Sequence, residues 1–240
     1  MKVFTTINPN GNFMTQDNAM RSWALRFSVY SINTKDEILK IKDLYPYVSF
    51  IETEITYDYK NKKLVKLNSI LSSIKDSKTK YCAIVNSDII LNSNMNFDKK
   101  ILNNGILIGS RYEINGDETY IFEAGYDLFI FDSKNIDLFF NENYVIGMPW
   151  WDYWVPIIAI KSMMNIYHIE NEVLYHITHE TNYDYEIWNE FGDFFYNDIL
   201  KNNGIWKTND DVNNLQDSKE QICLAIKKFI ESKHINIKVK

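Results

Sequence analysis

The 240-residue sequence has little cysteine, little arginine and no long apolar run. Its two cysteines, Cys82 and Cys223, lie far apart. This spacing excludes a disulfide framework and a cysteine-rich zinc site, and it predicts buried thiols in a reducing compartment. No uncharged apolar stretch approaches the roughly 18 residues of a membrane span, and the first residues resemble a strand rather than a signal peptide. We therefore expect a soluble, cytoplasmic protein.

The charged residues are acidic in excess, and few of the basic ones are arginines. The net charge of −6 argues against sequence-independent binding of nucleic acid, which needs a basic face. The three arginines are Arg21, Arg26 and Arg111, so a bound diphosphate would be neutralised by a metal ion rather than by guanidinium groups. The last fourteen residues carry five lysines and one glutamate. They predict a solvated tail, with weak peripheral contact to a membrane surface as the alternative.

What the sequence does contain is a regular alternation of strand and helix patterns in its first third. Short apolar segments predict strands at 2–8, 28–32, 47–53 and 80–85. Helical periodicity predicts helices at 15–27, 34–44 and 64–74, and residues 54–61 read as a loop. Such alternation with short connections predicts parallel βαβ units and a doubly wound α/β sheet.

The second half of the chain is less regular. Strands are predicted at 105–109, 127–131 and 172–179, and helices at 135–140, 183–203 and 217–232. A further helix should begin near Pro149, and Pro156 should kink it or end it early. We expect a single domain of three parts, at residues 1–92 and 93–180 and a C-terminal helical extension at 181–240.

The most informative motif is Asn86-Ser87-Asp88, which follows the apolar strand at 80–85. The carboxyl end of such a strand is where open α/β sheets bind ligands. Asp88 could hold a hard divalent cation there, and the cation could hold phosphate oxygens. The alternative is a polar turn without a function, because all three residue types favour turns.

Three features follow the motif in chain order. Gly125 precedes a strand, Asp152 lies at a helix start and His176 lies near the end of a late strand. This order, over residues 2–180, resembles the GT-A glycosyltransferases, which transfer a sugar from a nucleotide-sugar donor. In that comparison Asn86-Ser87-Asp88 looks like the Asp-x-Asp motif, with Asn86 in place of the first acid. The resemblance implies a Rossmann-like fold with a mostly parallel sheet flanked by helices and with aromatic C-terminal helices. It also implies that residues 1–92 are a nucleotide-binding half and residues 93–180 an acceptor and metal half.

The resemblance also implies a metal site for Mn²⁺ or Mg²⁺. Asp88 and His176 are the expected ligands, with His179 as the alternative histidine. Residues three apart on a strand point to opposite faces, so both histidines could bind one ion only if the strand had ended. A histidine ligand favours Mn²⁺. Without the resemblance, a hydrogen-bonded structural histidine is the simpler interpretation.

Asp152 is the candidate general base of an inverting transfer, in which a carboxylate deprotonates the acceptor hydroxyl. Neighbouring rings, Trp150 and Trp151 among them, would raise its pKa by desolvation and could stack on a sugar. The alternative is that these aromatic residues belong to the core and that Asp152 caps a helix.

The remaining expected contacts are weaker. The resemblance assigns nucleotide binding to Thr6, Ile7, Asn8, Lys66, Asn68, Asn86 and Ser87, and acceptor or sugar binding to Arg111 and Gly125. The alternative for Lys66 is a solvated side chain. The alternative for Arg111 is a surface ion pair with Glu113, Asp117 or Glu118.

The sequence thus predicts a metal-dependent, inverting glycosyltransferase with a UDP-sugar donor and a glycan, lipid-linked or protein acceptor. Two rivals stay open. A nucleotidyltransferase would need a first loop rich in glycine and lysine, whereas Pro9-Asn10-Gly11-Asn12 has one glycine and no lysine. A sugar- or nucleotide-binding module that has lost catalysis is favoured by Asn86.

Overall fold

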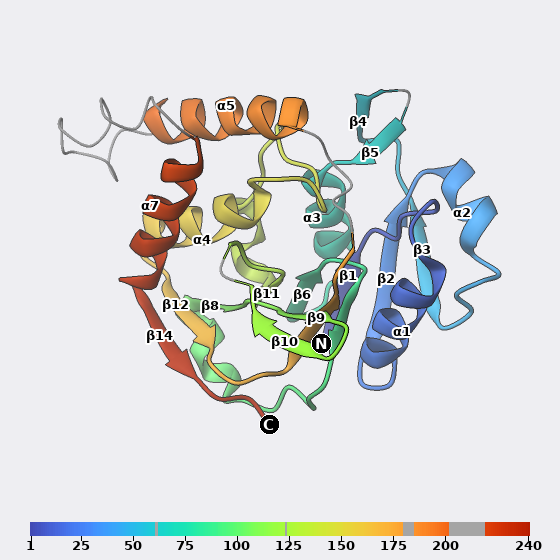
Figure 1. Cartoon of the computed structure of the whole chain (residues 1–240), viewed down its shortest axis with the longest axis horizontal. Helices are drawn as coiled ribbons and strands as arrows, with labels where there is room; N and C mark the ends of the chain where they lie inside the picture. Colours follow the sequence, from blue (N-terminus) through green and yellow to red (C-terminus); the bar gives the residue numbers. More distant parts are fainter. Residues whose placement is uncertain (61, 123, 180–184, 202–218) are drawn as a thin grey trace.

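A computed structural model describes residues 1–60, 62–122, 124–179, 185–201 and 219–240 (Figure 1). Among these residues, eight strands form a central sheet. Their order across the sheet is β14 (His234–Ile237), β12 (Asn165–Ile169), β8 (Gly105–Gly109), β11 (Leu128–Asp132), β6 (Tyr81–Val85), β1 (Lys2–Thr5), β2 (Ser28–Asn33) and β3 (Val48–Glu52). The sheet is mostly parallel, with β11 antiparallel to both of its neighbours.

The first third of the chain forms the predicted βαβ units. Strands β1, β2, β3 and β6 run parallel. The helices between them are α1 (Phe13–Ala24), α2 (Lys35–Ile41) and α3 (Leu67–Asp76). Thr34 caps α2 through a reciprocal capping box with Glu37, as the sequence indicates. The structure therefore confirms the predicted α/β class and the Rossmann-like start of the chain.

A smaller sheet and a hairpin complete the strands of the described residues. The smaller sheet has the order β10 (Glu118–Ile121), β9 (Tyr112–Asn115), β13 (Leu174–Ile177) and β7 (Ile89–Leu91). The hairpin joins β4 (Thr56–Tyr59) to β5 (Lys62–Val65) where the sequence predicted a loop at 54–61. Tyr57 and Tyr59 lie on the same side of β4 and pack against one of the two hydrophobic cores of the protein, which explains the strand.

Two hydrophobic cores lie on opposite faces of the central sheet. Alternating residues of β6 divide between them: Cys82 and Ile84 face one core, and Ala83 and Val85 face the other. The first core is covered by α3, α4 (Trp151–Lys161), α5 (Tyr185–Lys201), α7 (Lys219–Glu231) and the 3₁₀ turn η2 (Ser133–Leu138). The second is covered by α1, α2, the 3₁₀ turn η1 (Lys99–Asn104) and the smaller sheet.

The first core contains residues from all three predicted parts of the chain, among them Phe4, Phe129 and Ile226. These parts are packed against one another. The functional division at residues 92 and 180 stays a prediction.

The structure differs from the sequence-based expectations about elements at three further points. Helix α4 continues through Pro156 as far as Lys161, because its residues are buried on nearly every side and this packing outweighs one lost backbone hydrogen bond. The expected solvated tail contains β14, which pairs in parallel with β12. Strand β12 itself was not predicted. The predicted end of the helix at 183–203 lies outside the described residues. None of the helices in the described ranges combines the length and the apolarity needed to cross a membrane.

Candidate active site

The site lies where the strand order of the sheet reverses. From β1 the chain crosses to β2 and β3 on one side, whereas β6 lies on the other side of β1. The loops that follow β1 and β6 therefore lie at the topological switch point of the sheet, outside the carboxyl ends of the strands, which is where open α/β sheets bind ligands. The first loop contains Asn8, and the second contains Asn86-Ser87-Asp88.

Gln16, from α1, connects these two loops. Its Oε1 accepts hydrogen bonds from the Asn8 backbone N–H at 2.9 Å and from Ser87 Oγ at 3.0 Å, and its Nε2 donates to the Asn8 carbonyl at 3.0 Å. The Gln16 side chain is buried. A Cβ at Gly11 would lie 2.5 Å from Gln16 Nε2, so glycine is what allows the loop to pass this close. The two loops are thus held at a fixed separation.

The predicted nucleotide contacts after β1 differ in exposure. Ile7 is buried, and its backbone is held by Ser31 Oγ and Asn33 Nδ2 at 3.0 and 2.9 Å. Thr6 is half-buried and Asn8 is exposed. Asn8 is therefore the one of the three with its side chain most open to a ligand.

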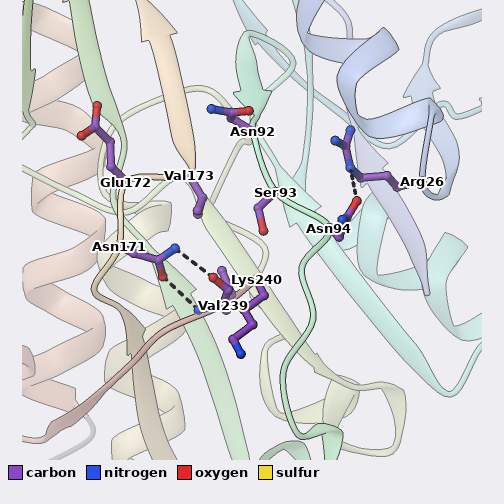
Figure 2. A pocket seen from close by; sticks show the side chains of 9 residues that line it. All are labelled: Arg26, Asn92, Ser93, Asn94, Asn171, Glu172, Val173, Val239 and Lys240. Atoms are coloured by element: carbon purple, nitrogen blue, oxygen red, sulfur yellow. Dashed lines mark hydrogen bonds between the residues drawn. The ribbon is translucent and has the colours of Figure 1, made fainter.

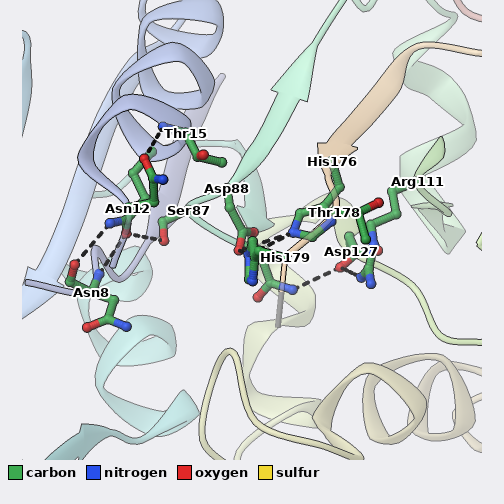
Figure 3. Close-up of polar contacts among 12 residues, drawn as sticks. Asn8, Asn12, Thr15, Ser87, Asp88, Arg111, Asp127, His176, Thr178 and His179 are labelled. Atoms are coloured by element: carbon green, nitrogen blue, oxygen red, sulfur yellow. Dashed lines mark hydrogen bonds and ion pairs between the residues drawn. The ribbon is translucent and has the colours of Figure 1, made fainter. Parts of the chain in front are cut away.

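Asp88, His176 and His179 come together at the end of β13. Each offers one ligand atom, and these atoms lie within 4.8 Å of one another. The Nε2 atoms of His176 and His179 are 3.1 Å apart, and they lie 3.5 and 3.4 Å from Asp88 Oδ2 (Figure 3). Strand β13 ends at Ile177, which satisfies the condition under which both histidines can face one ion.

The chemistry of this cluster fits a divalent cation. Burial raises the pKa of Asp88, but the neighbouring imidazoles of His176 and His179 outweigh it and hold the carboxyl pKa well below its usual range. Asp88 is thus a carboxylate at neutral pH. One carboxylate oxygen with two imidazole nitrogens is a donor set that suits Mn²⁺.

A chain of buried polar groups extends from His176 toward the middle of the site. His176 Nδ1 lies 2.8 Å from Glu113 Oε2. Arg111 bridges Glu113 and Asp127 at 2.6 and 2.8 Å. Asp127 Oδ1 also accepts from Asn86 Nδ2 at 2.9 Å. The cluster of Asp88, His176 and His179 is therefore linked to the first residue of the Asn-Ser-Asp motif through a continuous set of charge-assisted hydrogen bonds.

Arg111 has these two carboxylates as partners and also stacks on Phe122, with its guanidinium 3.8 Å from the ring centroid. The ion pair with Glu113 is the alternative that the sequence offered, but the side chain is only 19% exposed and the pair is not a surface one. Whether Arg111 contacts a phosphate or an acceptor stays a prediction.

Asp152 lies in the first turn of α4, against Gly125. Its Oδ2 accepts from the Tyr126 backbone N–H at 3.3 Å. Burial and the nearby charge of Asp127 raise the pKa of Asp152 to about 7. Gly125 has a φ of +94°, and a Cβ there would lie 2.2 Å from Asp152 Oδ2. Gly125 thus leaves room for the carboxylate of the candidate base.

The residue that precedes α4 is in an uncommon backbone conformation. Trp150 has a φ of 77°, which is rare for a large side chain and is tolerated only where the surroundings fix it. Its indole packs on Trp188 and Phe195, and its Nε1 donates to the Trp188 carbonyl at 2.9 Å. The strained turn sets the start of the helix from which Asp152 reaches Gly125.

The two tryptophans differ from the expected sugar platform. Trp150 and Trp151 are 2% and 1% exposed, so neither presents an open face to a sugar. They lie in the first core because α4 is apolar around its whole circumference. Their contribution to the site is the apolar surrounding that disfavours a charge on Asp152.

Lys66 and Asn68 are engaged with the protein. Asn68 is buried, donates to Glu142 Oε1 and accepts from the Asn141 backbone N–H, both at 2.9 Å. Lys66 Nζ lies 3.8 Å from Glu142 Oε2. A contact of either residue with uracil or ribose stays a prediction.

A polar pocket of about 400 Å³ lies at the far end of β7 and β13 (Figure 2). Asn92 and Val173 border it, next to the paired residues Leu91 and Leu174, whereas Ile89 pairs with His176 at the other end. None of the sequence-predicted site residues lines this pocket, so it is separate from the candidate site.

Three residues of the site were not singled out by sequence reasoning: Gln16, Glu113 as a partner of His176, and Asp127. Gln16 resembles any polar residue in the first turn of a helix, and no motif marks it. Glu113 and Asp127 could have been suspected as acids near predicted strands, but the pairing of strands far apart in the chain is not visible in one sequence.

Comparison with known proteins supports the fold. No protein-family model and no curated protein sequence matches this chain. Among solved structures, the chain is similar to residues 1–349 of S. aureus TarS in complex with UDP-GlcNAc, with a TM-score of 0.56 and 13% identity, over 97% of this chain and 71% of that one. The TarS fragment in complex with UDP gives a TM-score of 0.51 and 14% identity, over 85% of this chain and 66% of that one.

These identities are low, so the similarity establishes the architecture alone. The Rossmann-like fold expected from the sequence is therefore confirmed by two independent observations, the strand order of the sheet and the similarity to TarS. The chain spans 71% and 66% of the two TarS chains.

Proposed function

We propose that this chain is a GT-A-type glycosyltransferase that moves a sugar from a UDP-sugar donor to an acceptor hydroxyl with the help of Mn²⁺ or Mg²⁺. One observation carries the proposal: the ligand atoms of Asp88, His176 and His179 converge within 4.8 Å at the edge of the sheet where ligands bind. The fold is similar to that of S. aureus TarS, whose crystal structures contain UDP-GlcNAc or UDP.

The three converging residues would hold the cation. When bound, it would neutralise charge that develops on the diphosphate leaving group, a role for which few arginines are present in the chain. Thr6, Ile7 and Asn8 would border the base, and Asn86 and Ser87 the ribose. Gln16 fixes Asn8 and Ser87 relative to each other, so the base and the ribose would both meet a preorganised surface.

Asp152 would act as the general base. The acceptor oxygen forms a bond to the anomeric carbon while the bond from that carbon to the β-phosphate oxygen breaks. The acceptor proton goes to Asp152, and the electron pair of the broken bond leaves with UDP. A carboxylate with a pKa of about 7 is a suitable proton acceptor near neutral pH. Transfer in this arrangement inverts the anomeric configuration.

A panel of nucleotide-sugars tests the proposal. A ligand that binds the native state raises its melting temperature, so at least one UDP-sugar should stabilise the chain, and more strongly with Mn²⁺ present. Release of UDP from that donor should follow, and Asp88→Ala should abolish the metal-dependent part. Absence of any metal-enhanced stabilisation by UDP or a UDP-sugar would contradict the proposal.

A binding module without catalysis is the second candidate, because Asn86 brings no charge and its amide is already bound to Asp127. Such a module would show the same stabilisation by a donor. It would not release UDP with any acceptor or with water, and Asp152→Asn would leave all its measured properties except stability unchanged.

A further inference from the structure

Glu113 is enclosed by three hydrogen-bonding partners. Its Oε1 accepts from Arg111 Nε at 2.6 Å. Its Oε2 lies 2.8 Å from His176 Nδ1 and accepts from Thr178 Oγ1 at 2.9 Å. Glu113 is 5% exposed and His176 6% exposed, so water does not replace these partners. A carboxylate is an acceptor only, and every group around it must therefore donate.

This requirement fixes the ring of His176. If Nδ1 donates to Glu113, the neutral imidazole carries its proton on Nδ1 and its lone pair on Nε2. Nε2 is the atom that lies 3.5 Å from Asp88 Oδ2 and 3.1 Å from His179 Nε2. We infer that Glu113 is a positioning residue that holds His176 in the tautomer able to bind a divalent cation through Nε2. The inference rests on the proposed function, whose cation these ligands would hold.

The smaller sheet sets this geometry. Strands β9 and β13 are parallel neighbours, and Glu113 lies directly opposite His176 in their register. Both side chains thus lie side by side on one face of the sheet. Because the pair is built on strands, the ring is oriented before any ligand arrives.

Because of Arg111, the hydrogen bond between residue 113 and His176 depends on which side-chain atom of residue 113 faces His176. A guanidinium cannot accept a hydrogen bond, so an amide at position 113 has to turn its oxygen toward Arg111. Asp127 holds Arg111 in place at 2.8 Å. The amide nitrogen would then face His176 and Thr178. The Thr178 hydroxyl can become an acceptor, and His176 can accept only by moving its proton to Nε2, where it would block the ligand position.

The experiment compares the wild type with Glu113→Gln and Thr178→Val. Nitrogen-15 NMR of the imidazoles, recorded on the metal-free protein in alkaline buffer where the rings are neutral, reports the tautomer. Calorimetric titration with MnCl₂ reports the affinity. Thr178→Val is the matched control, because it removes a donor to the same carboxylate oxygen without changing what His176 faces.

We expect the proton of His176 on Nδ1 in the wild type and in Thr178→Val, and on Nε2 in Glu113→Gln. The Mn²⁺ affinity of Glu113→Gln should fall by about 10- to 100-fold, as is typical for the loss of an outer-shell partner of a metal ligand. The affinity of Thr178→Val should stay near that of the wild type. A wild-type His176 with its proton on Nε2 overturns the inference, whether or not the variant folds.

Unchanged Mn²⁺ affinity in a folded Glu113→Gln variant also overturns it. Failure of the proposed function has a different signature: the wild type and both variants all fail to bind Mn²⁺, while the tautomer still switches in Glu113→Gln. That result would remove the cation from the site and leave Glu113 as the residue that sets the ring.

Discussion

His176 and His179 turn their Nε2 atoms toward each other, 3.1 Å apart, although they are three residues apart in the chain. On a continuous strand they would face opposite sides of the sheet. Strand β13 ends at Ile177, and the backbone N–H of Thr178 still donates to the Ile114 carbonyl at 3.0 Å. The hydrogen bond of Thr178 therefore fixes the backbone just after the end of β13. Because the regular strand stops there, His176 and His179 can lie on the same side.

Loss of His179 should weaken the cation site as strongly as loss of its partners. For His179→Gln and for Asp88→Asn we expect Mn²⁺ affinity to fall by more than the roughly 10- to 100-fold that outer-shell changes cause, because each removes a direct ligand. Titration calorimetry measures this. His234→Gln is the control, since His234 lies on β14 at the outer edge of the central sheet. Wild-type affinity in His179→Gln would show that His179 is not a ligand.

The transfer rate should depend on the protonation of Asp152. Burial and the charge of Asp127 raise the pKa of Asp152 to about 7. A base works only when unprotonated, so kcat/KM should rise about tenfold per pH unit below pH 7 and level off above it. A pH–rate profile with a saturating donor and a fixed acceptor measures this limb. A limb near the ordinary carboxyl pKa would mean that a different group, or an exposed carboxylate, accepts the proton.

The α/β scaffold was accessible from the sequence because it depends on local signals. Buried strands such as 80–85 alternate with capped helices, and the Thr34–Glu37 box marks one helix start to the residue. The Asn-Ser-Asp motif and the late histidines were accessible for the same reason, since they lie at or just after the end of a strand. Pro156 did not end its helix early, because its local cost is outweighed by tertiary burial.

The supporting contacts of the site could not be read in this way. Glu113 meets His176 only through the pairing of β9 with β13, which are far apart in sequence. Gln16 meets Ser87 only because β1 and β6 are neighbours. Trp150 and Trp151 were expected at the surface of the site and lie in the core, since an aromatic cluster looks the same in a sequence whether it packs inward or binds a sugar.

Replacing the candidate base should stabilise the fold. The pKa of Asp152 is raised in the folded state, so the folded chain holds a proton that the unfolded chain has released between about pH 4 and pH 7, and stability falls as pH rises through this window. Asp152→Asn removes that penalty, which grows by about 1.4 kcal/mol for each pH unit within the window. Urea unfolding at several pH values should show a gain that grows toward pH 7 and then stays constant. If Asp152→Asn were less stable than the wild type at alkaline pH, burial would not be the cause of the raised pKa of Asp152.

Gly125→Ala should damage both stability and transfer. The backbone φ of +94° disfavours any side chain, and the new methyl would lie 2.2 Å from Asp152 Oδ2. We expect a stability loss of about 1–3 kcal/mol from the strain alone and a lower kcat because the carboxylate is displaced. Gly116→Ala is the matched control: its φ is +61°, and nothing lies within 4 Å of its added Cβ. It should lose stability but keep kcat. Equal losses of kcat in both variants would show that Gly125 does not act on the rate through Asp152.

Restoring the acid that the Asp-x-Asp comparison lacks should not improve the site. Asn86 Nδ2 donates to Asp127 Oδ1 at 2.9 Å, and Asn86→Asp would place two carboxylates at this distance in a buried setting. Like charges this close disfavour ionisation of both groups, so one of them would keep a proton or the loop would move. Arg111 can balance Asp127 but is already shared with Glu113. We expect a lower melting temperature that falls further as pH rises, and no gain in Mn²⁺ affinity. Asp127→Asn removes the repulsion but also the carboxylate that contacts Arg111, so the cost of Asn86→Asp is compared in the two backgrounds. Asn86→Asp should cost less stability in Asp127→Asn than in the wild type. An equal cost in both backgrounds would show that the contact with Asp127 is not what makes asparagine necessary at position 86.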